Sequence, residues 1–295
     1  MDRKLEIKRL CIYLLFSFGL AWILFFSFSI TGHKWDAKNP ELESLVGLGM
    51  LAPILAHVIT RWITKEGFAM TGKDSMMMGI NFKDKKWRFY LFAIFIPFLY
   101  VEIENIIFAL LSPSVFQWDN YKQHDIGIYL VFFYPIICII SAVISSFAAL
   151  GEEGGWRGYM MPKLIKLFGL KKALILGGII WGLWHAPHTC CGHNFGTDYL
   201  GFPYVGIIWM CIMCTATGVM LTYITYKTQS VWPAAFMHAV NNAMPTILGF
   251  FIDNEKATGI MSQMVLQWGI KMIPEIVIAI ICFVLLCKEE IKQGE

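Results

Sequence analysis

Long apolar stretches alternate with short polar connections along the chain, and several reach the roughly 20 residues that a helix needs to cross a bilayer. We predict such helices at about residues 10–30, 41–63, 87–111, 126–150, 172–190, 203–226, 231–251 and 269–287. The predicted fold class is therefore all-α: a polytopic membrane protein, built as a bundle of about eight transmembrane helices.

The composition supports this prediction, because 57% of the 295 residues are hydrophobic and only 15% are charged. In soluble domains about a quarter of the residues are charged. The first apolar stretch is too long for the apolar part of a signal peptide and lacks a small-residue cleavage pattern, so we expect a retained first span. No internal repeat or soluble domain is evident, and we predict a single transmembrane domain over residues 1–295.

The basic residues are distributed unevenly between the predicted connections. Of the 24 lysines and arginines, 19 lie at the two ends of the chain and around the connections after the second, fourth and sixth spans. The other five lie in the connections of the opposite side. Because lysine and arginine are enriched on the cytoplasmic side of membrane proteins, we predict that both termini are cytoplasmic.

Two adjacent acids and an arginine stand at the end of the fourth span, in the sequence GEEGGWR at residues 151–157. In a helix, Glu153 and Arg157 lie one turn apart and form a favourable pair. Glu152 lies about 100° further round the helix, so that Arg157 does not neutralise it. A free carboxylate shielded from water is suited to act as a general base. The alternative is an ordinary ion pair at the border of the membrane.

The sequence after these acids keeps its apolar pattern. We expect the fourth helix to continue past Arg157, with a kink near Pro162. This continuation would place Glu152 inside the bundle, below the membrane surface.

Two later spans also contain polar residues at helical spacing. Trp181 and His185 are four residues apart, as are His238 and Asn242. At ~1.5 Å per residue, His185 lies about 20 Å and His238 about 12 Å from the cytoplasmic side, so the two meet only if tilt or a deeper seventh span makes up the difference. In hydrocarbon each of these groups needs a polar partner, and we expect them to find one another.

In this order, the three motifs resemble those of the CPBP family, the CAAX-protease and bacteriocin-processing intramembrane endopeptidases, also called Abi. The motifs are Glu152-Glu153-x-x-x-Arg157, Trp181-x-x-x-His185 and His238-x-x-x-Asn242. The resemblance covers a motif-bearing core of about residues 126–251. Trp181 is a departure, because the family usually has phenylalanine there. The polar residues after the fifth span are a second departure: His188, Cys190, Cys191 and His193.

The resemblance implies hydrolysis of a peptide bond in a membrane-associated peptide or protein. Carried over to this chain, Glu152 would activate the attacking water and His185 would help to hold it. His238 and Asn242 would stabilise the oxyanion. Glu153, Arg157 and Trp181 would support the site. We expect the lipid bilayer and a membrane-associated substrate as partners, and no nucleic acid.

The resemblance leaves the cofactor unknown, since the family is often described as metalloproteases. Glu152, His185 and His238 could hold a zinc ion with an open position, although no H-E-x-x-H motif is present. With Glu152 as a ligand, no free acid would remain in the motifs to act as base. We therefore favour an enzyme without a tightly bound metal.

Several polar residues are open to two interpretations. His188, Cys190, Cys191 and His193 form either a separate metal or disulfide element or a polar outer loop. Glu102, Glu104 and Asn105 in the third span have either a structural or a functional role. Cys211-x-x-Cys214 has the spacing of a redox or zinc motif, but in its apolar run we expect both cysteines to act as small hydrophobic residues.

Two other functions are compatible with intramembrane polar groups. A transporter or proton relay also needs them, but it predicts internal repeats, and none is evident. A non-proteolytic regulator or scaffold of the same fold is the other alternative.

Overall fold

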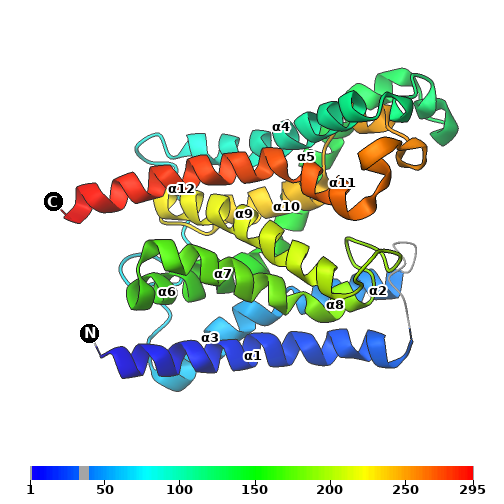
Figure 1. The fold of residues 1–295 in the computed structure, drawn as a ribbon. Coiled ribbons are helices and arrows are strands. Elements are labelled where there is room, and N and C mark those ends of the chain that lie inside the picture. Colours follow the sequence, from blue (N-terminus) through cyan, green and yellow to red (C-terminus); the bar gives the residue numbers. More distant parts are fainter. Residues whose placement is uncertain (1, 33–39, 295) are drawn as a thin grey trace.

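The computed structural model describes residues 2–32 and 40–294. Within these ranges all secondary-structure elements are helices (Figure 1). An isolated bridge pairs Phe116 with Ile252. The all-α prediction is confirmed. The α-helices are α1 (Arg3–Ile30), α2 (Pro40–Gly49), α3 (Ala52–Thr64), α4 (Trp87–Leu111), α5 (Ile128–Gly155), α6 (Met161–Phe168), α7 (Leu170–Trp184), α8 (Ala186–Cys190), α9 (Tyr204–Thr228), α10 (Trp232–Ala243), α11 (Met264–Lys271) and α12 (Ile273–Gly294).

Six helical stretches of the described chain are long and apolar enough to cross a membrane, which makes this an integral, multi-pass membrane protein. The helices α7 and α10, with 15 and 12 residues, are shorter than such spans. The predicted span at 231–251 ends as a helix at Ala243, because Met244 takes the left-handed conformation with φ 44°. Short 3-10 turns follow.

The fourth span continues past the acids, as expected, and forms one helical stretch from Ile128 to Phe168. Its distortion is not at Pro162, where we expected a kink. Instead, a π-helical turn, Trp156–Met160, joins α5 to α6. Pro162 stands in the first turn of α6, where its missing N–H removes little hydrogen bonding. Such π-helical turns are frequent at functional sites.

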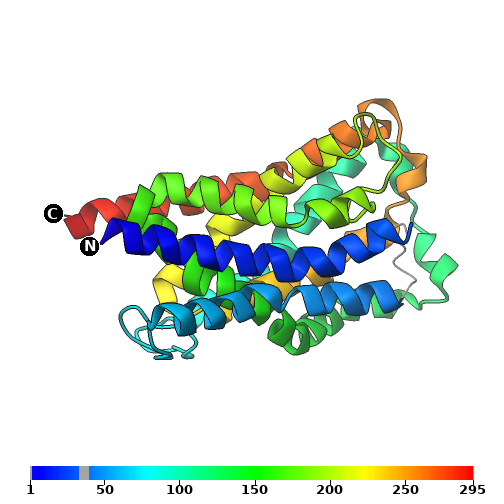
Figure 2. The ribbon, with the colours of Figure 1, turned by 90° about the horizontal axis from the view of Figure 1, so that it is seen from below.

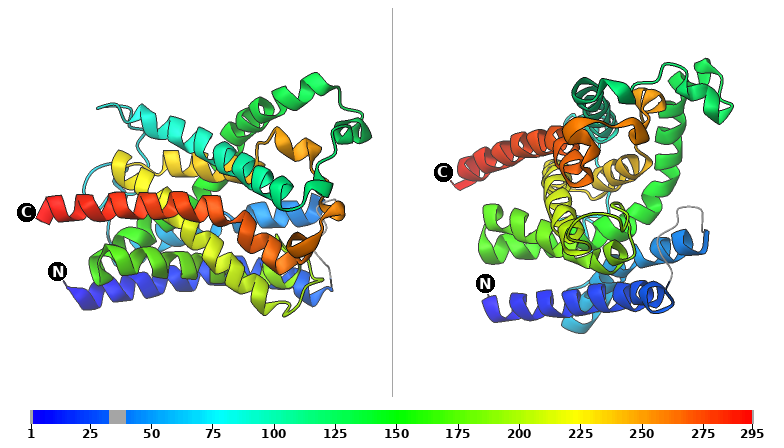
Figure 3. Two further views of the ribbon diagram at one scale, coloured as in Figure 1. Left: turned by 45° about the horizontal axis from the view of Figure 1, so that its top comes forward. Right: turned by 45° about the vertical axis from the view of Figure 1, so that its right-hand side comes forward.

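The bundle has two different ends. Both termini, the loop between α3 and α4, and the start of α7 lie at one end, which we call the terminal end (Figures 1 and 2). At the opposite end lie α2, α8 and α11. Between these ends, α9 crosses the bundle with α7 on one side and α12 on the other (Figure 3). α10 packs against α5, α4 and α9.

Charged side chains join three segments at the terminal end. Lys163 of α6 forms ion pairs with Glu6 of α1, at 3.0 Å, and with Glu66, which follows α3, at 2.5 Å. Burial alone would raise the pKa of Glu66, but hydrogen bonds from Lys163, Tyr159 and Thr64 outweigh it, and the pKa is lowered. This ionised cluster therefore closes the bundle beneath the π-helical turn.

Candidate active site

Glu152 lies in the last turn of α5, and its side chain is buried, with 3% of its surface exposed. One carboxylate oxygen, Oε2, accepts hydrogen bonds from the indole N–H groups of Trp181, at 2.7 Å, and Trp156, at 3.2 Å. The carboxylate has no ion pair with the described residues, as the sequence predicted. It is nevertheless held in place, because two indoles donate to the same oxygen.

The neighbouring Glu153 is fully buried and contacts the side chains of Arg157 and His238. Arg157 approaches its carboxylate to 3.0 Å, which confirms the predicted pair. His238 Nδ1 lies 2.8 Å from Oε1 of the same carboxylate. The guanidinium of Arg157 also stacks over the ring of Trp181, 4.3 Å from its centroid. Glu153 therefore connects α5 to the histidine on α10.

His238 is oriented by this contact. An ionised carboxylate only accepts hydrogen bonds, so Nδ1 of His238 carries the proton and donates it to Glu153. The other ring nitrogen, Nε2, is left for a ligand. A carboxylate fixes the orientation of the imidazole in the same way in serine proteases. The ring also meets Trp181 edge-on, with 5.4 Å between centroids.

His185 lies at the junction of α7 and α8, where Pro187 begins the new helix. Its Nδ1 is 2.9 Å from the backbone carbonyl of Trp181. Because a carbonyl only accepts, Nδ1 is the donor, and Nε2 of the neutral ring has a lone pair for another partner. His185 can thus accept a hydrogen bond from a bound water.

The four predicted catalytic residues line one cavity of about 700 Å³: Glu152, His185, His238 and Asn242. Trp181 also contributes to its wall. The unequal depths of His185 and His238 estimated from the sequence therefore do not keep them apart. Asn242 lies one turn after His238 on α10, and within the described ranges its amide makes no hydrogen bond.

The acids of the third span have separate roles. Glu102 accepts hydrogen bonds from the backbone N–H groups of Ile247 and Leu248 and so holds the chain after α10. Asn105 donates to Thr246 at 3.0 Å, and its role is also structural. Glu104, in contrast, lines the catalytic cavity. The sequence analysis could not place this helix beside the site.

A further acid in the cavity, Glu275, was missed by the sequence analysis. It lies in the first turn of α12 and accepts a hydrogen bond from the hydroxyl of Thr217 on α9. Its signal in the sequence is a single acid within the apolar run of the last span, the same signal that marked Glu152 and Glu153.

His188 and His193 also line this cavity, with 5.3 Å between their ring centroids. His188 is buried, and within the described part of the chain neither of its ring nitrogens has a hydrogen-bond partner. Burial, together with the neighbouring His185, lowers the pKa of His193 to about 3. Cys190 and Cys191 form no disulfide with the described residues. The polar segment after α7 is therefore part of the cavity wall.

The donor groups do not fit a metal site. Among the side chains that the structure describes, no three from His, Cys, Asp or Glu are grouped closely enough to hold a metal ion. Nδ1 of His185 and Nδ1 of His238 are engaged by a carbonyl and by Glu153, contacts that orient a histidine equally well toward a metal or a bound water, so the spacing of the donor groups is what decides. We therefore derive no step through a metal.

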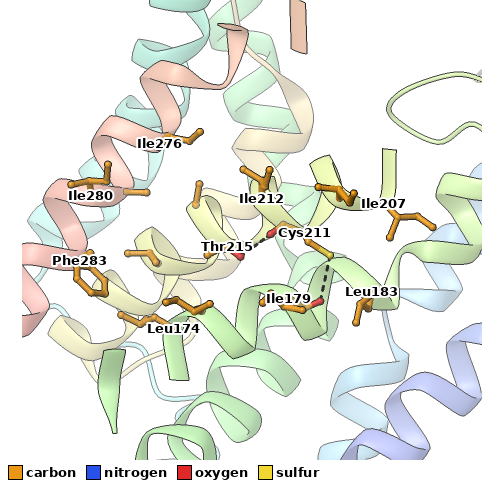
Figure 4. Close-up of a pocket in the computed structure, with 15 residues that line it drawn as sticks. Leu174, Ile179, Leu183, Ile207, Cys211, Ile212, Thr215, Ile276, Ile280 and Phe283 are labelled. Atoms are coloured by element: carbon orange, nitrogen blue, oxygen red, sulfur yellow. Dashed lines mark hydrogen bonds between the residues drawn. The ribbon is translucent and has the colours of Figure 1, made fainter. Parts of the chain in front are cut away.

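A second, apolar groove of about 630 Å³ lies between α7, α9 and α12 (Figure 4). Cys211 lines it, and the thiol lies 3.8 Å from the carbonyl of Ile179. Cys214, one turn further on, lines the catalytic cavity instead. Since the two thiols face different spaces, they do not form a redox or zinc pair.

Comparison with known proteins gives an independent view of the same residues. Residues 134–244 match the model of a protein family described as Rce1-like, type II CAAX prenyl endopeptidase. This stretch includes every predicted catalytic residue, from Glu152 to Asn242. The predicted family resemblance is confirmed.

A curated relative extends the similarity beyond the motifs. The CAAX prenyl protease 2 of Methanococcus maripaludis is 27% identical to this chain over 247 residues, which cover 83% of the chain and 86% of the relative. The similarity to CAAX proteases thus reaches well outside the core predicted at about 126–251. Together with the apolar helices, it indicates a membrane protease.

Proposed function

We propose that this protein is an intramembrane endopeptidase that cleaves a membrane-associated peptide or protein with water activated by Glu152. One observation carries the proposal: a buried carboxylate without an ion-pair partner shares a cavity with two oriented histidines and an uncommitted amide. Peptide hydrolysis needs a base, a positioned water and donors for the oxyanion. These residues supply all three.

The first step is attack by water. Oε2 of Glu152 is held by the indoles, and Oε1 makes no hydrogen bond with the described residues, so it can accept a proton from water. His185 Nε2 accepts the water's second hydrogen bond and aims its oxygen. As the oxygen bonds to the peptide carbon, its proton moves to Glu152 and the carbonyl oxygen becomes an oxyanion.

The oxyanion is stabilised by Asn242 and His238. The amide of Asn242 donates one hydrogen bond. His238 already donates Nδ1–H to Glu153, so it donates at Nε2 as an imidazolium, balanced by the carboxylate of Glu153. The tetrahedral intermediate collapses when Glu152 returns its proton to the leaving nitrogen, and the C–N bond breaks.

We also propose the orientation of the chain and its independence of metal. The excess of lysine and arginine at the terminal end supports cytoplasmic termini. The spacing of the donors, of which no three His, Cys, Asp or Glu side chains are grouped together among the described residues, supports a metal-free, glutamate-dependent reaction.

The purified full-length chain, reconstituted in liposomes with a peptide library, tests the activity. Wild type should cleave a subset of peptides. Glu152→Gln should lose at least about 100-fold in kcat, the low end of a general base's contribution. Glu104→Gln, which removes another acid of the same cavity, is the matched control and should keep its turnover. No cleavage by wild type, or equal cleavage by Glu152→Gln, would favour a scaffold or a transporter.

A further inference from the structure

The wall of the catalytic cavity reaches one end of the bundle. From the catalytic residues its wall continues through side chains that belong to the end opposite the termini. These side chains come from α2, the α8–α9 loop, the C-terminus of α10, and α11: Val46, Asn194, Met244, Trp268 and Lys271. Figures 1 and 2 place those segments together at that end. We call it the mouth end.

The cavity is closed toward the terminal end. The π-helical turn Trp156–Met160 follows Glu152 and Glu153 closely in the sequence, and all five of its residues are buried. Tyr13 of α1 packs against Trp156 and Tyr159, with ring centroids 5.9 and 5.2 Å apart. None of the described residues in 2–32, 52–99 or 276–294 lines the cavity. Beyond this aromatic layer lies the ionised cluster around Lys163.

The two ends of the bundle also differ in their number of basic residues. In the sequence, 19 of the 24 lysines and arginines belong to the terminal end and its connections. The mouth end has Lys122, Lys256 and Lys271 among its described residues. By the positive-inside tendency, the terminal end faces the cytoplasm. The cavity then opens on the other side of the membrane.

We infer that this enzyme takes its substrate from the non-cytoplasmic side. The substrate class is an exported peptide, or an outward-facing segment of a membrane protein, that has already crossed the membrane. A lipid-modified C-terminus on the cytoplasmic face would meet the closed end. Cleavage of such a substrate rests on the proposed function, whereas the direction in which the cavity opens rests on the wall residues and the charges alone.

Cysteine labelling in intact cells tests the direction without requiring proteolysis. Ser145 lines the cavity and is exposed, whereas its neighbour Ser146 is buried with 1% exposure, so Ser145→Cys and Ser146→Cys form a matched pair. Ser262→Cys marks the mouth end and Lys73→Cys marks the terminal end, both at exposed positions. A charged, membrane-impermeant maleimide is added before or after permeabilisation, and labelled peptides are identified by mass spectrometry.

We expect Ser145→Cys and Ser262→Cys to be labelled in intact cells, Lys73→Cys only after permeabilisation, and Ser146→Cys in neither state. The same pattern should appear in a Glu152→Gln background. Labelling of Lys73→Cys in intact cells would overturn the inference. So would a Ser145→Cys that reacts only after permeabilisation, or not at all, while Ser262→Cys reacts.

Membrane vesicles of known orientation separate this inference from the proposed function. A water-soluble peptide library is added outside right-side-out or inside-out vesicles that contain wild type. Cleavage by right-side-out vesicles alone supports both. Cleavage by inside-out vesicles alone overturns the inference and leaves the protease activity standing. No cleavage in either orientation, with labelling as expected, overturns the protease activity alone.

Discussion

Trp181 is the residue at which this chain departs from the family motif, and its indole N–H explains what the departure does. A phenylalanine ring would also pack between Arg157 and His238, but it has no donor for Glu152. The hydrogen bond of 2.7 Å to Oε2 is thus a feature of this chain. It holds Oε2 of the carboxylate, and Oε1 accepts no hydrogen bond from the described residues.

Trp181→Phe should therefore lower kcat about tenfold while leaving the fold intact, because a hydrogen bond to a charged group contributes roughly 1.5–3 kcal/mol and Trp156 remains as a second donor. Trp232→Phe is the control, since it removes an indole bond of 2.8 Å to the Met78 carbonyl, outside the cavity. Steady-state kinetics on the same peptide compare the two. An unchanged kcat for Trp181→Phe, or an equal loss in both variants, would contradict the role of Trp181.

Glu153 has a structural role that Glu152 lacks, because it forms the ion pair with Arg157 and holds His238. Glu153→Gln should lower the melting temperature and the purified yield as well as the activity, since leaving a buried partner charge unpaired costs about 3–5 kcal/mol. Glu152→Gln should melt close to wild type. Thermal unfolding in detergent measures both variants. Equal melting temperatures would contradict the structural role assigned to Glu153 alone.

At the scale of single residues, sequence spacing predicts contacts within one helix. Glu153 and Arg157 meet because they are one turn apart. Trp156 stands one turn after Glu152 in the same way, so the sequence spacing could also have predicted the hydrogen bond between them. The hydrogen bond from Trp181 to Glu152 joins residues 29 positions apart, and the one from His238 to Glu153 joins residues 85 positions apart. The periodicity of a helix cannot predict such contacts between different helices.

At the scale of helices, glycines set how closely α5 approaches α3. Gly151 and Gly155 are four residues apart, and an added Cβ at Gly155 would lie 2.5 Å from the backbone carbonyl carbon of Pro53. At Gly151 it would lie 2.6 Å from the carbonyl oxygen of Met50. Small residues at this spacing let transmembrane helices come into close contact. The two acids of the site stand between these glycines.

Gly155→Ala should accordingly push α3 and α5 apart and lower both stability and activity, with a cost of about 1–3 kcal/mol for overpacking. Gly19→Ala on α1 is the control, because an added Cβ there meets nothing within 4 Å. It should be neutral or slightly stabilising. Thermal unfolding and kcat are the measurements. A Gly155→Ala protein as stable as Gly19→Ala would show that the close approach is not needed.

Helix positions were predicted well from apolar length, but their internal irregularities were not. The continuation of α5 past Arg157 followed from the pattern. The π-helical turn did not, because all five of its residues are buried and no polar face marks the shift of the helical period. The early end of α10 was hidden for a similar reason: the residues after Met244 remain apolar although they leave the helix.

At the scale of the whole molecule, the direction of the cavity could not be predicted from the sequence. The all-α membrane fold follows from composition and apolar length, and the charge asymmetry is visible in the sequence itself. Which end is sealed depends on Tyr13 packing against Trp156, a contact between the first span and the fourth. Likewise, Glu104 and Glu275 enter the cavity only because α4 and α12 pack around α9 and α10.

A metal-free reaction is a property of the whole enzyme and can be tested by removing metal. We expect substoichiometric zinc by elemental analysis, and activity that survives dialysis against a strong chelator. The reason is that no three histidine, cysteine or carboxylate side chains of the described residues are grouped around a common point. One zinc per chain, with activity lost on chelation and restored by zinc, would show that the site rearranges to bind metal.

The role of Glu152 as a general base is tested most directly by a single turnover in H₂¹⁸O with enzyme in excess. If Glu152 activates water, one ¹⁸O atom appears in the new carboxylate of the product, and none appears in the Glu152 side chain when the enzyme is digested and analysed by mass spectrometry. Appearance of ¹⁸O in the Glu152 carboxylate would mean that this group attacks the substrate itself, and would contradict the proposed mechanism.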